Sequence, residues 1–193
     1  TLGRTAKSEI VPKIYEDYDK AIENLPEKYS GLSSQRATKG AALALKARFA
    51  LYMGDWDIVA DATKKCMDLG IYKLHKDYSD LFLSTTKNSE ESIFLLPRSI
   101  EYKVTLGNWT VMNEVSRNPG GWGAFAPSWD LLAAYTCTDG LPIDESPLFV
   151  PNNPFKNRDP RCTATIVEFG TRHLGFEYNP HPDAVQVMNY NTG

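Results

Sequence analysis

Two consecutive amphipathic helices are predicted over residues 38–70, and this pair constrains the fold more than any other part of the sequence. Thr38 is a suitable N-cap for the first helix, because its hydroxyl oxygen can accept a hydrogen bond from a free amide of the first turn. Gly54 ends this helix, Asp55 caps the second helix, and Gly70 ends the second. A connection this short places the two helices antiparallel and adjacent.

Both helices carry apolar or small side chains at intervals of three or four residues, the spacing of one helix face. In the first helix these positions are Ala42, Leu45, Phe49 and Tyr52. In the second they are Ile58, Val59, Ala62, Cys66 and Leu69. The first helix also carries alanines that allow another helix axis to approach closely: Ala41, Ala42, Ala44, Ala47 and Ala50.

The pair resembles a tetratricopeptide unit, in which an alanine-rich helix, a Gly-Asp-Trp turn and a second amphipathic helix follow each other. Lys46 falls where that pattern has a large apolar residue, and Val59 falls where it has alanine. A further helix is predicted from about Ser8 to Leu25, with Pro12 in its first turn. The resemblance implies stacked helical hairpins in the first half of the chain.

After the helix pair, the sequence predicts shorter elements. Asp77 caps a short helix that runs through Phe82, and the apolar run 92–96 has the length and flanks of a strand. No helical periodicity is seen from residue 97 to 123, where glycine, asparagine and aromatic residues are frequent. Residues 128–136 return to a helix, and 163–167 read as a strand.

We therefore predict a mainly α fold, with tetratricopeptide-like helical hairpins, an irregular loop-rich lobe and a few short strands. We also predict that the chain consists of a helical part, residues 1–96, and a loop-rich part of the same domain, residues 97–193. A long loop within a folded domain is usually functional or disordered, and the aromatic residues of 97–123 argue against disorder.

Composition and motifs exclude several functional classes. The net charge of −3 comes from interspersed charges, so no basic patch predicts nucleic-acid binding. The three cysteines have no metal-binding spacing, although a disulfide between Cys137 and Cys162 is left open. The sequence contains no nucleophile elbow, phosphate-binding loop, zinc-protease motif or dinucleotide fingerprint. We predict that the protein is not an enzyme and uses no cofactor or metal.

The aromatic loop is the candidate ligand site. Aromatic faces bind the CH surface of a sugar by dispersion, while amides and guanidinium groups pair with its hydroxyls. One segment contains the aromatic, amide and guanidinium side chains that such a site needs: Trp109, Trp122, Tyr102, Asn108 and Arg117. The alternative is structural, with Trp122 and Phe125 filling the core beneath a long loop.

The order of several short segments resembles the SusD/RagB family of outer-membrane nutrient-binding lipoproteins. In the first half these segments are 36–42 (RATKGAA), 51–56 (LYMGDW), 70–74 (GIYKL), 78–82 (YSDLF) and 88–94 (NSEESIF). In the second half they are 127–135 (PSWDLLAAY), 139–142 (DGLP) and 157–161 (NRDPR). The lipid-anchored cysteine, the signal peptide, the first helices and the C-terminal helical segment of the family do not occur, so we interpret the chain as truncated at both ends.

The resemblance implies a protein at the surface of the bacterial outer membrane that captures a glycan, either an oligosaccharide or a polysaccharide. It would pass this ligand to a TonB-dependent, SusC-like transporter, and would meet the membrane only through a lipid anchor absent from this chain. The helical part would pack on the transporter and the irregular part would carry the ligand. Two alternatives stay open: a tetratricopeptide-like scaffold that binds protein, and a RagB-type protein that binds peptide.

Overall fold

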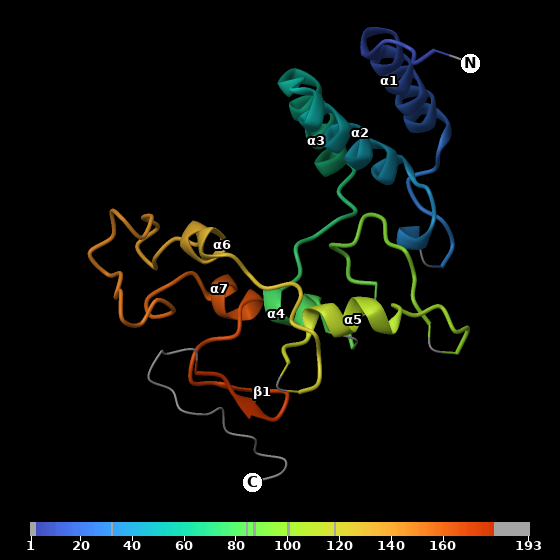
Figure 1. The fold of residues 1–193 in the computed structure, drawn as a ribbon. Helices are drawn as coiled ribbons and strands as arrows, with labels where there is room; N and C mark the ends of the chain where they lie inside the picture. The colour runs from blue at the N-terminus through green and yellow to red at the C-terminus, as the bar shows by residue number, and fades with distance from the viewer. Residues whose placement is uncertain are drawn as a thin grey trace. The chain divides into compact units, whose positions relative to one another are not determined.

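A computed structural model of the protein describes residues 3–179 except 32, 84, 87, 100 and 118. The chain divides into two units, Thr1–Pro97 and Arg98–Gly193, which we call the helical unit and the loop-rich unit. The described residues form seven α-helices and one two-stranded sheet, so the prediction of a mainly α fold is confirmed (Figure 1). None of the helices in this described part is long and apolar enough to cross a membrane.

The helical unit contains α1 (Lys7–Asn24), the short 3-10 helix η1 (Ser33–Gln35), α2 (Lys39–Met53), α3 (Trp56–Asp68) and α4 (Tyr78–Leu81). The α2–α3 hairpin forms as predicted. Thr38 Oγ1 accepts a hydrogen bond from the Ala41 amide at 3.1 Å, and Gly54 takes the left-handed conformation with φ of 81°. Near the other end of the hairpin, Cys66 Sγ in α3 lies 3.8 Å from the Gly40 carbonyl oxygen in α2, so the helices are antiparallel.

The buried face of α2 differs from the predicted stripe. Leu45 and Tyr52 are 40% and 75% exposed, whereas the buried residues are the small ones and one leucine: Gly40, Ala41, Ala42, Leu43, Ala47 and Ala50. The reason is that α2 packs against two neighbours, α3 and α1. Its short side chains let a neighbouring helix approach closely.

Phe49 is the main apolar contact between α1 and α2. Its ring centroid lies 5.3 Å from that of Tyr15, in an edge-to-face geometry, and 6.2 Å from that of Tyr18. The Tyr15 hydroxyl donates to the carboxylate of Asp55, and Asp55 makes no side-chain cap to α3, contrary to the prediction. Burial, together with this hydrogen bond to an anionic partner, raises the pKa of Tyr15 to about 12.

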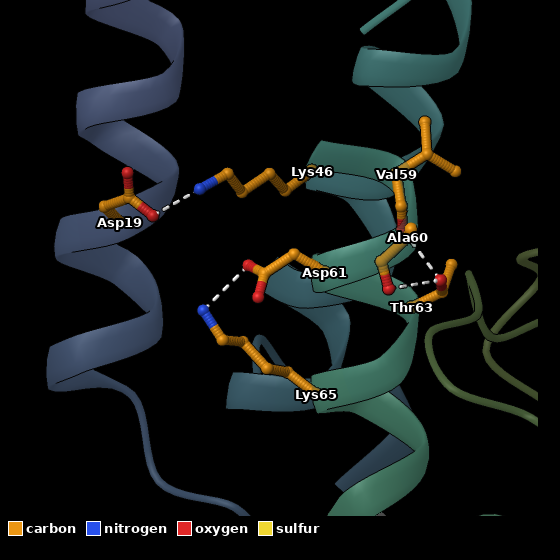
Figure 2. Close-up of polar contacts among 7 residues, drawn as sticks. All are labelled: Asp19, Lys46, Val59, Ala60, Asp61, Thr63 and Lys65. Carbon is orange, nitrogen blue, oxygen red and sulfur yellow. Dashed lines mark hydrogen bonds and ion pairs between the residues drawn. The ribbon is translucent and has the colours of Figure 1, made fainter. Parts of the chain in front are cut away.

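Lys46 carries a charge at a position where the tetratricopeptide pattern has a large apolar residue, and its contacts show how this charge is accommodated. Its side chain is only 12% exposed and its ammonium pairs with Asp19 of α1, so the aliphatic stem is packed while the charge is satisfied (Figure 2). The neighbouring pair Lys65–Asp61, at 2.7 Å within α3, is exposed on both sides (Figure 2). Such a pair contributes only about 0.5 kcal/mol or less.

The rest of the helical unit is mostly irregular. Asp77 caps α4 as predicted, because its Oδ1 accepts from the amides of Ser79 and Asp80. The strand predicted over 92–96 is wrong, since no ladder forms there and the Leu95 amide instead donates to the Ser34 carbonyl at 2.9 Å. A short apolar run becomes a strand only where a partner strand is available, and none lies beside it in the described part of this unit.

The loop-rich unit contains α5 (Asn108–Glu114), α6 (Trp129–Ala134), α7 (Pro160–Thr165), β1 (Arg172–His173) and β2 (Phe176–Glu177). Helix α6 forms as predicted, with Ser128 Oγ accepting from the Leu131 amide. Its Leu132 packs with residues of α7 and of the neighbouring loops in a small core: Leu132, Phe155, Cys162 and Ile166.

Two predictions for this unit are corrected by the structure. The strand predicted over 163–167 does not form, and 163–165 are instead the last residues of helix α7, which Asp159 caps and in which Pro160 occupies the first turn. The region 97–123, which showed no helical periodicity, contains α5.

The strands that do form, β1 and β2, are an antiparallel pair with Arg172 opposite Glu177. Cys137 and Cys162 are buried free thiols, so the disulfide that the sequence left open is not formed.

Arg158 is buried and connects several segments of the loop-rich unit. Its Nη2 donates to the carbonyls of Leu132 and Tyr135 at the end of α6, at 2.5 and 2.6 Å. Its Nη1 donates to the Pro154 carbonyl at 2.7 Å, and its guanidinium lies 5.6 Å from the centroid of the Phe149 ring. The carbonyls at the end of α6, which have no partner inside the helix, are thereby satisfied.

The first testable prediction concerns Gly40, because a Cβ added there would lie 2.0 Å from the Tyr72 hydroxyl oxygen. We expect Gly40→Ala to destabilise the helical unit by about 1–3 kcal/mol through overpacking. In a Tyr72→Ala background the same change should cost nothing or stabilise α2, since alanine is the better helix former. Urea unfolding followed by far-UV circular dichroism tests this cycle, and an equal cost in both backgrounds would show that the Tyr72 contact is not responsible.

The second prediction concerns Arg158. We expect Arg158→Ala to destabilise the loop-rich unit by about 2–4 kcal/mol, because two buried carbonyls and one partly buried carbonyl lose a donor. Arg158→Lys should recover little, since an ammonium cannot reproduce the fork of the guanidinium. Arg161→Ala is the control, because the Arg161 side chain is 60% exposed and its ion pair with Asp159 is worth about 1 kcal/mol or less. Urea unfolding monitored by tryptophan fluorescence in a Trp56→Phe background reports on this unit, and equal midpoints for Arg158→Ala and the control would contradict the prediction.

Candidate functional site

Helix α5 presents Trp109 to solvent. Gly107 precedes the helix and Trp109 is its second residue, with 73% of its surface exposed. An indole that stays exposed on a short helix contributes little to packing. It is therefore available to a ligand.

The segment after α5 turns back and binds the end of this helix through its backbone. The amide of Trp122 donates to the Met112 carbonyl at 2.7 Å, and the amides of Ala124 and Phe125 both donate to the Asn113 carbonyl, at 2.9 and 3.0 Å. The Gly123 amide donates to the Val115 carbonyl at 2.9 Å. The amides of this segment thus satisfy carbonyls in the last turn of α5 and just after it, which have no partner within the helix.

Gly121 makes this close return of the chain possible. It is buried, and a Cβ at this position would lie 2.0 Å from the Val115 carbonyl oxygen. Gly120, with φ of 97°, supplies the left-handed turn that precedes it. No role was predicted for these two glycines, although a Gly-Gly pair is a signal for a tight turn.

The return of the chain brings Trp122 against Trp109. Their ring centroids are 4.7 Å apart with an interplanar angle of 67°, an edge-to-face pair. Trp122 remains 41% exposed, and its carbonyl accepts a hydrogen bond from Arg117 Nε at 3.3 Å. Trp109, Trp122 and Arg117 therefore form one exposed group, which we call the tryptophan pair and its arginine.

The other two predicted site residues lie differently. Tyr102 is 75% exposed in a tight turn closed by the bridge between Ser99 and Val104, and no ring contact or hydrogen bond joins it to the tryptophans in the described structure. Asn108 is the first residue of α5, and its side chain lies outside the described part. Neither Trp122 nor Phe125, which is 64% exposed, fills the core as the structural alternative supposed.

The described residues contain no group of three or more His, Cys, Asp or Glu side chains placed to hold a metal ion. The strongest carboxylate perturbation is at Asp159, where hydrogen bonds from Arg161 lower its pKa to about 2. Asp159 caps α7, so this shift has a structural cause. The chemistry that the tryptophan pair and its arginine offer is non-covalent contact and hydrogen bonding.

The third testable prediction is that Gly121→Ala separates the two indoles, because the added Cβ cannot fit beside the Val115 carbonyl. The exciton couplet that two close indoles give in circular dichroism should disappear, as it should in Trp109→Phe. Gly107→Ala is the control, since a Cβ there meets nothing within 4 Å. A couplet that persists in Gly121→Ala would show that this glycine does not set the geometry of the pair.

Comparisons with known proteins identify the family. Residues 90–192, more than half of the chain, match the model of the SusD family. The crystal structure of a SusD-like protein from Bacteroides fragilis NCTC 9343 is similar to this chain, with a TM-score of 0.70 and 28% identity. The similarity covers 87% of this chain and 36% of that one, so the chain spans little more than a third of its relative. No curated protein matches it. The chain belongs to the SusD family.

Proposed function

We propose that this chain binds an oligosaccharide without catalysis, at the tryptophan pair and its arginine. The observation that carries the proposal is the exposed edge-to-face pair of Trp109 and Trp122, held in place by the backbone of the loop. Two indoles fixed in this way lose little conformational freedom when a ligand binds, so preorganisation favours affinity.

The chemistry of the group suits a sugar. The apolar CH face of a pyranose ring packs on an indole by dispersion and exclusion of water. Arg117 uses Nε for the Trp122 carbonyl, and the other N–H groups of its guanidinium are of the kind that pairs with sugar hydroxyls. Asn108 and Tyr102 are candidates for further contacts, on the ends of a longer ligand.

Membership of the SusD family supports a proposal for the wider role. We propose that the longer protein is a lipoprotein of the outer membrane surface that delivers its ligand to a TonB-dependent, SusC-like transporter. The helical unit offers an apolar surface for such a partner at the α2–α3 turn, where Leu51, Tyr52 and Trp56 are 50%, 75% and 67% exposed. A peptide ligand, or a protein partner without any glycan, would instead support the scaffold or RagB-type alternatives.

The fourth testable prediction is that Trp109→Ala and Trp122→Ala each weaken glycan binding by roughly five- to thirtyfold, because a lost aromatic contact is worth about 1–2 kcal/mol. A glycan array identifies the ligand, and calorimetry with the same ligand measures the variants. Trp56→Ala is the matched control, since Trp56 is a comparably exposed tryptophan of the helical unit.

Three outcomes of this experiment are distinguishable. Loss of binding in the two loop variants, with the control unchanged, supports the site. Binding that survives in both loop variants places the sugar elsewhere. If the protein binds a peptide but no glycan on the array, the RagB-type, peptide-binding alternative is favoured.

A further inference from the structure

A cavity of about 480 Å³ lies within the loop-rich unit, formed by residues other than the tryptophan pair and its arginine. Its size falls in the range of small-molecule sites. Six aromatic side chains from separate segments of the unit contribute to its lining: Phe125, Trp129, Phe155, Phe169, Phe176 and Tyr178. The proposed sugar site does not account for this cavity.

The floor of the cavity is apolar and belongs to the core of the unit. Leu132, Phe155 and Ile166 line it and are only 5–8% exposed. Phe169 packs edge-to-face on Phe155 at 5.0 Å between ring centroids. The floor is therefore supported by packed side chains, and its shape does not depend on one mobile residue.

Aromatic walls rise from this floor and remain accessible. Trp129 is 58% exposed, Phe125 is 64% exposed, and Tyr178 is 40% exposed. Large aromatic side chains that face an open cavity leave apolar area in contact with water, which an apolar ligand would remove.

The polar groups of the lining are all on exposed residues, away from the floor. Two of the hydroxyls already accept one hydrogen bond each within the protein, Ser128 Oγ from the Leu131 amide and Thr165 Oγ1 from the Tyr135 hydroxyl. The remaining polar side-chain groups are those of Glu114, Ser116 and His173, together with the indole N–H of Trp129 and the hydroxyl of Tyr178. A sugar needs hydrogen-bonding partners on most of its edge, and a floor of this kind leaves its hydroxyls unpaired. The chemistry of the cavity suits an uncharged aromatic ring.

We propose that this cavity is a second binding site, which takes an uncharged, planar aromatic group into the floor formed by Leu132, Phe155 and Ile166. The site is distinct from the proposed sugar site in residues and in ligand chemistry. Its ring-bearing ligand is held by edge-to-face and stacking contacts with the aromatic walls, and the polar groups of the exposed lining accept or donate to a hydroxyl on that ring.

The experiment is calorimetry of the full 193-residue chain with 2-naphthol, and with its saturated analogue decahydro-2-naphthol as the non-aromatic arm. We expect 2-naphthol to bind roughly three- to tenfold more tightly, because only the planar ring makes aromatic pair contacts. Heat capacity measured in the same titrations should fall on binding, as apolar surface is buried. Equal affinity for the two alcohols, or no binding of 2-naphthol, overturns the proposal.

Two alanines of the same loop provide a matched pair of variants. Ala126 lines the cavity, whereas Ala124, two residues earlier and also exposed, is not among its lining residues. Ala126→Trp should fill the cavity and weaken 2-naphthol binding at least tenfold, while Ala124→Trp should leave it unchanged. Unfolding midpoints of both variants confirm that each is folded. Equal binding by the two variants would show that the ring does not enter this cavity.

A third variant separates this proposal from the proposed function. Trp109→Ala removes an indole outside the cavity, so it should retain 2-naphthol binding whether or not it still binds a glycan. Loss of 2-naphthol binding in Trp109→Ala would place the aromatic ligand on the tryptophan pair and overturn the second site. Failure of glycan binding alone would leave the cavity result unaffected.

Discussion

The loop-rich unit depends on donors for the backbone carbonyls at the ends of its short helices. Helices of six or seven residues, such as α5 and α6, are not stable alone, because nucleation costs more than so few hydrogen bonds return. The end of α5 is satisfied by amides of the segment 122–125, and the end of α6 by the guanidinium of Arg158. The same contacts that complete each helix also fold the neighbouring loop onto it.

This constraint explains how an irregular segment can present a defined site. Trp109 is carried by α5 and Trp122 by the returning loop, so the hydrogen bonds that join helix and loop also set the distance between the two indoles. Arg158 acts in a similar way on two residues of the cavity floor, since it joins the Leu132 carbonyl of α6 to the carbonyl of Pro154, which precedes Phe155 in the chain. In both places a ligand would meet side chains whose positions are already determined.

The helical unit is stabilised differently, through close contact between helix axes. Short side chains of α2 face α3, while Phe49 fills the space between α2 and the two tyrosines of α1. Lys46 lies in the same interface, with its stem packed and its charge paired to Asp19 (Figure 2). Long regular helices satisfy most of their own backbone, so this unit needs fewer contacts from loops.

Strong local signals in the sequence place several elements of the structure. The caps Thr38, Ser128 and Asp77, and the glycine at position 54, place α2, α6 and α4 because each acts within one turn of the chain. Trp109 and Trp122 also stood out as aromatic residues in a segment without periodicity, but the sequence left open whether Trp122 is exposed or fills the core. Other features depend on the tertiary structure. These are the buried face of α2, the helical conformation of 163–165 and the absence of a strand at 92–96. The contact of Trp122 with Trp109, and the absence of a contact between Tyr102 and either tryptophan, are of the same kind. Those outcomes depend on partners distant in sequence, such as the second neighbour of α2 and the carbonyls of α5, and no local pattern encodes their position.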